Sequence, residues 1–246
     1  MTISIETLTE RGIAKAIDHS LLRPELDDRF VEDGCRLAAE YHVASVCVRP
    51  ADVARARAIL EGTDVAVGTV IGFPHGNHLT ATKVFEAQRA LADGATELDM
   101  VIQIGALKSG RDADVQADIA AIVGVAHGAG AIVKVIFENA YLTDDEKVRA
   151  CRLSEAAGAD FVKTSTGFAP GGATHDDLRL MRANTSPHVQ VKAAGGVRTL
   201  DALLEVMALG TARIGATATK AIIDDFRARK AGGQRDSIGS SPDTGY

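Results

Sequence analysis

Eight short apolar runs are the feature of this sequence that most constrains its fold. They recur about every 25 to 35 residues, and each is followed by a longer segment with helical spacing of apolar residues. The runs cover residues 17–22, 43–48, 65–72, 97–102, 132–137, 160–163, 189–192 and 212–214. Strand and helix that alternate in this way predict a parallel sheet with helices packed against it, which is an α/β fold.

A closed barrel explains the number of units better than an open sheet does. The 246 residues are close to the roughly 250 that one barrel of eight strand-helix units needs. No GxGxxG motif follows the first run, as a doubly wound dinucleotide-binding sheet would require. We therefore predict a single-domain (β/α)8 TIM barrel over residues 1–230, with a short N-terminal helix and one short final helix.

The composition agrees with this fold. Hydrophobic residues make up 46% of the chain but aromatic residues only 4%, and there is no Trp. The core must therefore consist of Ala, Val, Ile and Leu, which suits parallel strands buried on both faces. Residues 231–246, AGGQRDSIGSSPDTGY, are rich in Gly and Ser and lack apolar spacing, so we expect a flexible C-terminal tail.

Charge and cysteine usage exclude several classes of function. A net charge of -6 without a basic cluster argues against a nucleic-acid partner. The N-terminus has no apolar run of signal-peptide length, and no stretch approaches the roughly 20 apolar residues that span a bilayer. The three cysteines are widely spaced and form no CxxC pair, so neither a disulfide framework nor a structural zinc site is expected. We expect a cytoplasmic protein without a membrane partner.

Local signals mark the helix ends. Thr143 precedes three acidic residues and a helical stretch, as an N-cap does. Gly94, Gly130, Gly158 and Gly210 each stand just before a predicted strand, where the end of a helix favours a left-handed residue.

Charged residues alternate with apolar ones in four consecutive predicted strands. Side chains in a strand point alternately to opposite faces, and one face of a barrel strand points inward. The ionisable residues assigned to the inner faces are Glu97, Asp99, Lys134, Glu138, Lys163 and Lys192. A purely structural barrel would be filled with Val, Ile and Leu, because an unpaired buried charge costs several kcal/mol. The charges therefore indicate a paired, functional cluster.

The six residues need not share one role. Glu97, Lys134 and Glu138 could form an ion-pair network that only maintains the shape of the barrel. Asp99, Lys163 and Lys192 lie toward the C-terminal ends of their strands, where barrel enzymes place catalysis. We predict that these three are catalytic.

Six motifs closely resemble those of deoxyribose-phosphate aldolases: GATELDMVIQIGALKSG, ADFVKTSTGF, VKAAGGVRT, IDHSLLRP, VCVRP and VIGFPHG. The resemblance runs from about residue 13 to about residue 222. It implies a class I aldolase, a lyase that needs no metal or other cofactor and has a (β/α)8 barrel. The implied reaction is the reversible retro-aldol cleavage of 2-deoxy-D-ribose 5-phosphate to acetaldehyde and D-glyceraldehyde 3-phosphate, a step of deoxyribose phosphate catabolism. A homodimer is common among such proteins.

The resemblance also implies roles for the three catalytic candidates. Lys163, in KTST, corresponds to the lysine that forms the Schiff base; Lys192, in VKAAGG, to the second active-site lysine; and Asp99, in ELDMVI, to the proton-transfer carboxylate. A lysine at its reference pKa near 10.4 is neutral only about four times in ten thousand at pH 7. We therefore expect the neighbouring ammonium of Lys192 to lower the pKa of Lys163.

The phosphate of such a substrate needs backbone N–H donors, which barrels gather after strands 7 and 8 and at the start of a short helix. Our candidates are Gly195, Gly196, Gly215 and Thr217, with Gly167 from the loop after strand 6. The same glycines could instead serve only to form tight turns. Ser20 is expected to contact a substrate oxygen.

The sequence departs from the family pattern near the expected phosphate site. Ser20 replaces the usual threonine of IDHT, Ala218 follows Thr217 where many relatives have two serines, and Phe168 stands where some relatives have lysine. These changes bear on affinity for phosphate and leave the type of reaction unchanged.

Three weaker signals remain. Cys47 could border the pocket and react with an unsaturated aldehyde, or could be a small packing residue. Tyr246 resembles the C-terminal tyrosine of relatives that folds over the active site, although it could equally be part of a disordered tail. His75 and His78 have no acidic residue beside them in the sequence, so we expect no metal site.

Two other functions fit part of these observations. Another class I aldolase or a transaldolase would share the imine chemistry but would release a product other than acetaldehyde. A non-catalytic phosphosugar-binding barrel would keep the glycines but would need neither Lys163 nor Asp99.

Overall fold

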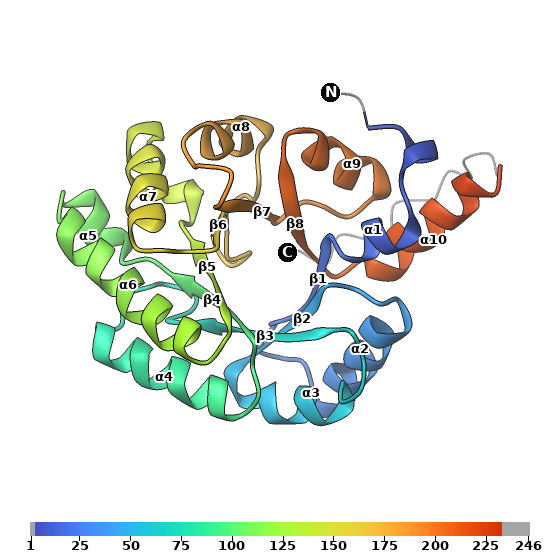
Figure 1. Cartoon of the computed structure of the whole chain (residues 1–246), viewed down its shortest axis with the longest axis horizontal. Helices are drawn as coiled ribbons and strands as arrows, with labels where there is room; N and C mark the ends of the chain where they lie inside the picture. Colours follow the sequence, from blue (N-terminus) through green and yellow to red (C-terminus); the bar gives the residue numbers. More distant parts are fainter. Residues whose placement is uncertain (1–2, 233–246) are drawn as a thin grey trace.

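The computed structural model describes residues 3–232, which form a closed barrel of parallel strands surrounded by helices (Figure 1). Each strand pairs with the next one in the chain, and β8 pairs with β1. The strands are β1 (Ile17–Leu21), β2 (Ser45–Val48), β3 (Ala66–Ile71), β4 (Glu97–Val101), β5 (Ile132–Ile136), β6 (Phe161–Lys163), β7 (Gln190–Ala194) and β8 (Thr211–Ala216). The predicted (β/α)8 fold is confirmed.

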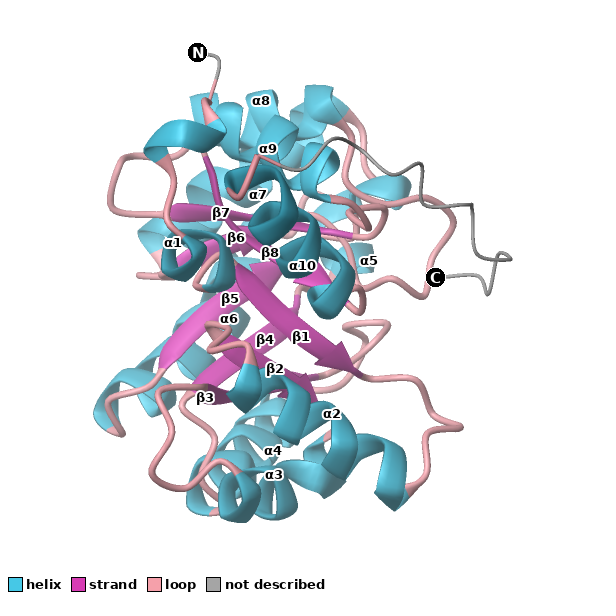
Figure 2. Ribbon diagram, turned by 90° about the vertical axis from the view of Figure 1, so that its right-hand side faces the viewer, coloured by secondary structure: helices cyan, strands magenta, loops and turns pink. Residues whose placement is uncertain are grey.

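Helices connect the strands and cover the outside of the barrel (Figure 2). The α-helices are α1 (Glu10–Ala14), α2 (Asp28–Glu40), α3 (Val53–Ile59), α4 (Thr80–Ala92), α5 (Ile104–Lys108), α6 (Asp112–Gly128), α7 (Asp144–Ala156), α8 (His175–Ala183), α9 (Leu200–Ala208) and α10 (Thr219–Lys230). Short 3-10 helices cover Ile5–Thr7, Pro50–Asp52 and Asn139–Tyr141. No helix within residues 3–232 is both long enough and apolar enough to cross a lipid bilayer.

Strand β8 and the final helix are both longer than predicted. Strand β8 is longer than the apolar run 212–214, because it continues through Gly215 and Ala216 in the backbone ladders of β7 and β1. The final helix α10 has 12 residues and is not short, since it buries Ile222, Ile223 and Phe226 against the barrel. Backbone pairing and one buried helix face define these elements, whereas the prediction followed unbroken apolar runs.

The local signals at the helix ends are confirmed. The side chain of Thr143 accepts a hydrogen bond from the backbone N–H of Glu146, whose carboxylate in turn accepts one from the N–H of Thr143, forming a capping box. The four glycines before β4, β5, β6 and β8 all have positive φ, between 72° and 106°. The chain therefore turns from helix to strand at these positions through the left-handed region.

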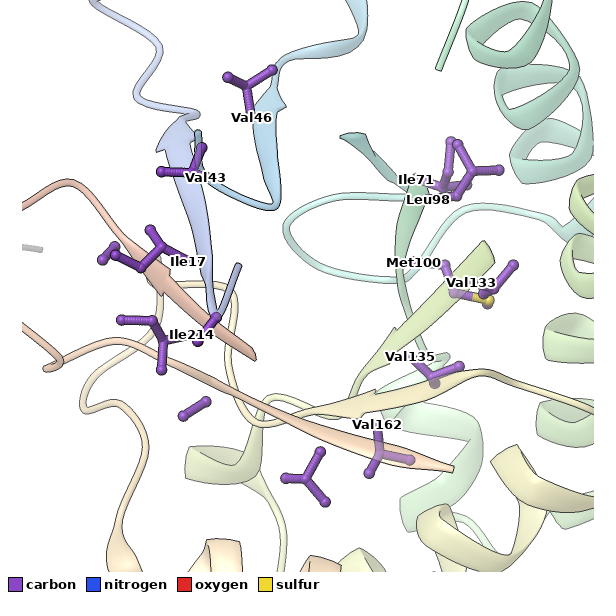
Figure 3. Packing of buried hydrophobic residues seen from close by; sticks show 14 of the residues in the cluster. Ile17, Val43, Val46, Ile71, Leu98, Met100, Val133, Val135, Val162 and Ile214 are labelled. Carbon is purple, nitrogen blue, oxygen red and sulfur yellow. The ribbon is translucent and has the colours of Figure 1, made fainter. Parts of the chain in front are cut away.

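Apolar side chains fill the layer between the strands and the helices (Figure 3). Leu98, Met100, Val133, Val135 and Val162 are all fully buried there. They alternate along β4, β5 and β6 with Glu97, Asp99, Lys134 and Lys163. Because successive side chains point to opposite faces, the apolar set packs against the helices and the charged set points into the barrel.

A buried ion pair joins two helices to the end of β4. Lys83 of α4 and Asp118 of α6 are fully buried, and Lys83 Nζ lies 2.6 Å from Asp118 Oδ2. The same amine donates a hydrogen bond to the carbonyl oxygen of Val101 at 2.8 Å, and the hydroxyl of Thr80 donates to Asp118 Oδ1 at 2.7 Å. The amine thus attaches α4 and α6 to the strand that carries Asp99, two residues before Val101.

We expect Lys83→Met to lower the free energy of unfolding by about 3–5 kcal/mol, because it leaves the carboxylate of Asp118 buried without its cation. Arg89→Met provides the control. Arg89 pairs with Asp93, the C-cap residue of the same helix, but is 62% exposed, so its loss should change stability by no more than about 1 kcal/mol. Urea unfolding of both variants measures the difference. Equal effects would show that the buried ion pair contributes no more to the free energy of unfolding than the exposed one.

Candidate active site

A pocket lies at the C-terminal ends of the strands. Its lining includes Lys163 of β6, Lys192 of β7 and Asp18 of β1, together with residues of the segments that follow β6, β7 and β8. This is the end of the barrel where enzymes with this fold place their catalytic groups.

The structure brings the three predicted catalytic residues together. Asp99 Oδ2 lies 2.7 Å from Lys163 Nζ and 2.8 Å from Lys192 Nζ, so both amines share one carboxylate oxygen. Lys163 and Lys192 are direct neighbours in the ladder between β6 and β7. All three side chains are at least 96% buried. The contact therefore lies in a region where water screens charge only weakly.

Four further charged residues extend this contact across the barrel. Lys134 Nζ lies 2.8 Å from Asp99 Oδ1 and 2.6 Å from Glu97 Oε2. Lys192 also pairs with Asp18 Oδ2 at 2.5 Å. Arg213 of β8 forms ion pairs with Asp18 and, at 3.1 Å, with Glu97 Oε1. Every carboxylate of this group therefore contacts at least two cationic side chains.

Burial and neighbouring charges give the lysines different proton affinities. Burial lowers the pKa of Lys163, Asp99 opposes this shift, and Lys192 lowers the pKa further. Burial also disfavours the charged form of Lys192, but Asp18 and Asp99 outweigh it and raise the pKa of that amine. The expected effect of Lys192 on Lys163 thus has the predicted sign, although burial is the larger cause.

Asp99 and Lys134 remain charged. Burial favours the neutral form of Asp99, but Lys134, Lys163 and Lys192 hold its pKa well below its usual value. Burial likewise disfavours the ammonium of Lys134, whereas Asp99, Glu97 and Asp18 raise its pKa well above the ordinary value. Lys163 therefore gives up its proton more readily than its two lysine neighbours do.

Glu138 does not join this group, contrary to the alternation used to place it. Strand β5 ends at Ile136, and Glu138 has a left-handed backbone with φ of 58°, so the two-residue period no longer applies. Its carboxylate accepts hydrogen bonds from the backbone N–H of Thr166, at 3.2 Å, and from the Thr166 hydroxyl. Glu138 therefore holds the segment after β6, which carries Thr166 into the pocket lining.

Most of the predicted phosphate-binding residues also line the pocket. Ser20, Gly195, Gly196, Gly215 and Thr217 belong to its lining. Gly167 has a left-handed φ of 87° in the loop after β6, but it is not among the described residues that line the pocket. A role for Gly167 in binding phosphate stays a prediction.

Gly195 has a second reason to be glycine. Its φ is 81°, and a Cβ there would lie 2.9 Å from the Cα of Gly172. The backbone N–H of Ala173 donates hydrogen bonds to the carbonyl oxygens of Ala194 and Gly195 at 3.0 and 3.1 Å. Two loops thus pack backbone to backbone, so tight packing alone accounts for glycine at this position. A Cβ on Gly196 would meet nothing within 4 Å.

The start of α10 lies beside these residues. The helix follows Thr217 and Ala218, and its N-cap residue, Ala218, makes no side-chain capping hydrogen bond. His19 Nδ1 lies 2.9 Å from the hydroxyl of Thr219, which fixes the first turn of α10 against β1. The guanidinium-bearing residue Arg198 also lines the pocket. Helix N–H groups and a guanidinium are suitable donors for an anion.

Asp18, Arg198 and Arg213 were not predicted as site residues from the sequence. Asp18 precedes Ser20 by two residues, so the strand period that applies to Ser20 could have placed Asp18 on the same inner face. Arg213 is an arginine in the middle of a short apolar run, which is itself a signal of a paired inner charge. Arg198 follows the two glycines of GGVR, and no periodicity applies in that loop.

The weaker candidates have varied surroundings. Cys47 lines the pocket, and burial raises the pKa of its thiol to about 11, so the thiol stays protonated at neutral pH. Phe168 packs edge-on against Phe73, with ring centroids 5.2 Å apart.

Tyr246 and residues 233–245 of the expected flexible tail lie outside the described residues. Among residues 3–232, no three His, Cys, Asp or Glu side chains are grouped so that they could hold a metal ion.

Comparisons with known proteins agree with this geometry. Residues 13–224 match the DeoC/LacD family aldolases. The chain is 50% identical over 215 residues to a deoxyribose-phosphate aldolase of Rhodopirellula baltica, covering 87% of this chain and 89% of the relative. It is 54% identical over 212 residues to a deoxyribose-phosphate aldolase of Bacillus cereus strain AH187, covering 86% and 95%.

A solved structure shows the same fold at lower identity. The deoxyribose phosphate aldolase from Aeropyrum pernix, described as having a unique tetrameric structure, superposes with a TM-score of 0.83 at 30% identity. The match covers 90% of this chain and 93% of that one. Since the family match and both sequence relatives span most of the chain, the protein belongs to the DeoC/LacD family of aldolases.

Proposed function

We propose that this aldolase cleaves 2-deoxy-D-ribose 5-phosphate reversibly to acetaldehyde and D-glyceraldehyde 3-phosphate through an imine on Lys163. The observation that carries the proposal is the placement of Lys163 in the pocket, with its pKa lowered and its amine 2.7 Å from Asp99. The names of the curated relatives support the choice of substrate.

The reaction needs a place for an electron pair. The neutral amine of Lys163 adds to C1 of the open-chain sugar to give a carbinolamine. Proton transfer to its hydroxyl and loss of water then leave a protonated imine. A base removes the proton of the C3 hydroxyl, the C2–C3 bond breaks, and its electron pair moves toward the imine nitrogen to give an enamine. D-glyceraldehyde 3-phosphate leaves at this point. A proton added to C2 then restores an imine of acetaldehyde, which water hydrolyses to free the amine.

Asp99 and Lys192 are the proposed partners for proton transfer. Asp99 stays ionised and contacts both amines, so it can accept a proton near the imine, directly or through a bound water. Lys192 retains its proton, because its pKa is raised, and it can donate a proton to the carboxylate of Asp99. Ser20 lies in the same lining, with a hydroxyl available to a substrate oxygen.

The phosphate is proposed to bind at the lip formed by Gly195, Gly196, Gly215 and Thr217. These residues line the same pocket as Lys163, and α10 begins just beyond them without a capping side chain. Thr217 offers one hydroxyl, whereas Ala218 offers none. The N–H groups of the helix start and the charge of Arg198 can compensate for the missing hydroxyl.

The setting of the enzyme follows from the same assignment. We propose a cytoplasmic enzyme of carbohydrate degradation that needs no metal, because the lysine imine supplies the electron sink. The candidate homodimer stays a prediction; the relative from Aeropyrum pernix is described as tetrameric.

Lys163→Met should lower kcat roughly 1,000-fold or more while the protein remains folded, because methionine has similar length but no nucleophilic amine. Acetaldehyde followed by borohydride should attach an ethyl group to Lys163 of the unmodified protein, which peptide mass mapping detects. Lys108→Met, at a lysine that is 46% exposed and pairs with Glu146, is the control and should keep both activity and labelling.

Two results would contradict the proposal. Full turnover by Lys163→Met would remove the imine from the mechanism. An unmodified protein that releases a three-carbon or larger aldehyde or ketone donor in place of acetaldehyde would be another class I aldolase or a transaldolase.

Arg198→Met should raise the KM for 2-deoxyribose 5-phosphate by about tenfold, the effect of losing one charge-assisted hydrogen bond to phosphate. The kcat/KM for unphosphorylated 2-deoxyribose should stay unchanged, because that substrate has no phosphate. Steady-state kinetics with both substrates makes the comparison. An equal loss with both substrates would place Arg198 outside the phosphate site.

A further inference from the structure

Seven charged or ionisable side chains form one connected group inside the barrel, which we name the barrel charge cluster. Among the residues that the structure describes, ion pairs connect three carboxylates and four bases in this way: Asp18, Glu97, Asp99, Lys134, Lys163, Lys192 and Arg213. With a proton on every base, the cluster carries one excess positive charge. With Lys163 neutral, three cations balance three carboxylates.

Arg213 belongs to this cluster through its ion pairs with Asp18 and Glu97. It is not among the described residues that line the pocket, and its side chain is 17% exposed. Its ion pairs are with Asp18 and Glu97, and neither of them includes Lys163. Chains of ion pairs lead from it to Asp99, for example through Asp18 and Lys192 or through Glu97 and Lys134.

The type of residue at position 213 matters because a guanidinium does not lose its proton under conditions in which proteins are stable. Its charge is therefore constant across the pH range in which an aldolase works. A lysine of the cluster, in contrast, can exchange its proton. Arg213 therefore contributes a constant positive charge to the cluster. Lys163 does not have to be protonated to supply that charge.

We propose that Arg213 is a positioning residue that keeps Lys163 in its free-base form, because its permanent charge completes the balance of the three buried carboxylates. This inference rests on the proposed imine at Lys163. Arg213 acts through Asp18, Glu97 and the two neighbouring lysines and does not touch the substrate.

Ionisable groups reach Lys163 and its contacts from nearly every strand of the barrel. They are Asp18 on β1, Cys47 on β2, Glu97 and Asp99 on β4, Lys134 on β5, Lys192 on β7 and Arg213 on β8. Strand β3 contributes none. Burial alone disfavours the ammonium of Lys163, while Asp99 at 2.7 Å favours it. The balance between these opposing effects depends on how completely the other cations neutralise Asp99 and the carboxylates behind it.

Removing the guanidinium should therefore favour the protonated form of Lys163 and raise the pKa of its amine. In Arg213→Met, two cations face three carboxylates while Lys163 is neutral, so protonation of Lys163 restores the balance. The pH at which the amine becomes reactive should rise by about one unit, the order of effect that one nearby charge has at an effective dielectric constant near 20. Methionine retains part of the side-chain packing against Phe161, whose ring lies 5.9 Å from the guanidinium.

Glu97→Gln should have the opposite effect. It removes one negative charge and leaves an excess of one cation with Lys163 neutral, so the reactive pH should fall by about one unit. The double variant, Arg213→Met with Glu97→Gln, again balances and should return close to the unmodified protein. General loosening of the barrel would not shift two single variants in opposite directions.

The test is the rate at which acetaldehyde and cyanoborohydride attach an ethyl group to Lys163, followed by mass spectrometry from about pH 5 to pH 10. The matched control is Arg229→Met. Arg229 is 18% exposed and pairs with Asp201 and Asp225, as Arg213 pairs with two carboxylates, but it lies on α10 outside the barrel. Its removal should leave the pH midpoint of labelling unchanged.

The outcomes separate this inference from the proposed function. An unmodified protein that gains no ethyl group on Lys163 would overturn the proposed imine itself. Labelling of the unmodified protein with an unchanged midpoint in Arg213→Met, or with both single variants shifted in the same direction, would overturn the role of Arg213. If Arg213→Met does not fold, Glu97→Gln decides: a lower midpoint supports the charge balance and an unchanged midpoint refutes it.

Discussion

The carboxylate of Asp99 is the centre on which the rest of the site depends. Its Oδ1 atom accepts a hydrogen bond from Lys134, and its Oδ2 atom accepts one each from Lys163 and Lys192. A buried carboxylate without partners would be very unfavourable, and so would three buried ammonium groups. The ammonium groups stabilise the buried carboxylate, and the carboxylate stabilises the buried ammonium groups. Because burial limits how many ammonium groups the site can hold, the arrangement favours one amine without its proton, and Lys163 is the lysine of the three whose pKa is lowered.

The barrel separates the side chains that stabilise the fold from those that we propose to be catalytic. Along β4, Leu98 and Met100 pack toward the helices, while Glu97 and Asp99 point inward on the same strand. The apolar layer can thus remain continuous although the interior carries charges. Outside the barrel, the buried contact of Lys83 with Asp118 and with the carbonyl of Val101 attaches two helices to the strand that bears Asp99. Precise placement of the proposed catalytic groups therefore depends on contacts well away from them.

Predictions from the sequence succeeded where a simple period applies. The strand alternation placed Asp99, Lys134, Lys163 and Lys192 on inner faces, and the fold brings these four together. It failed for Glu138, because β5 had already ended and the backbone there is left-handed. It missed Arg213 because the last run was taken as a brief apolar strand, whereas β8 extends through Thr211–Ala216 and carries a charge inward. The glycines of the lip illustrate another limit: Gly195 is needed where two loops meet, a contact that no local pattern reveals.

By itself the sequence determined the family, the number of strand-helix units and which face of each central strand carries charge, because these follow from motifs and from periods of two and about 3.6 residues. Only the tertiary structure decided which charges meet. Asp18 and Arg213 lie at opposite ends of the chain, yet they form an ion pair because closure of the barrel sets β8 beside β1. The proton affinity of Lys163 depends on burial and on charges from β1, β4, β5, β7 and β8, so no segment of the chain could specify it alone.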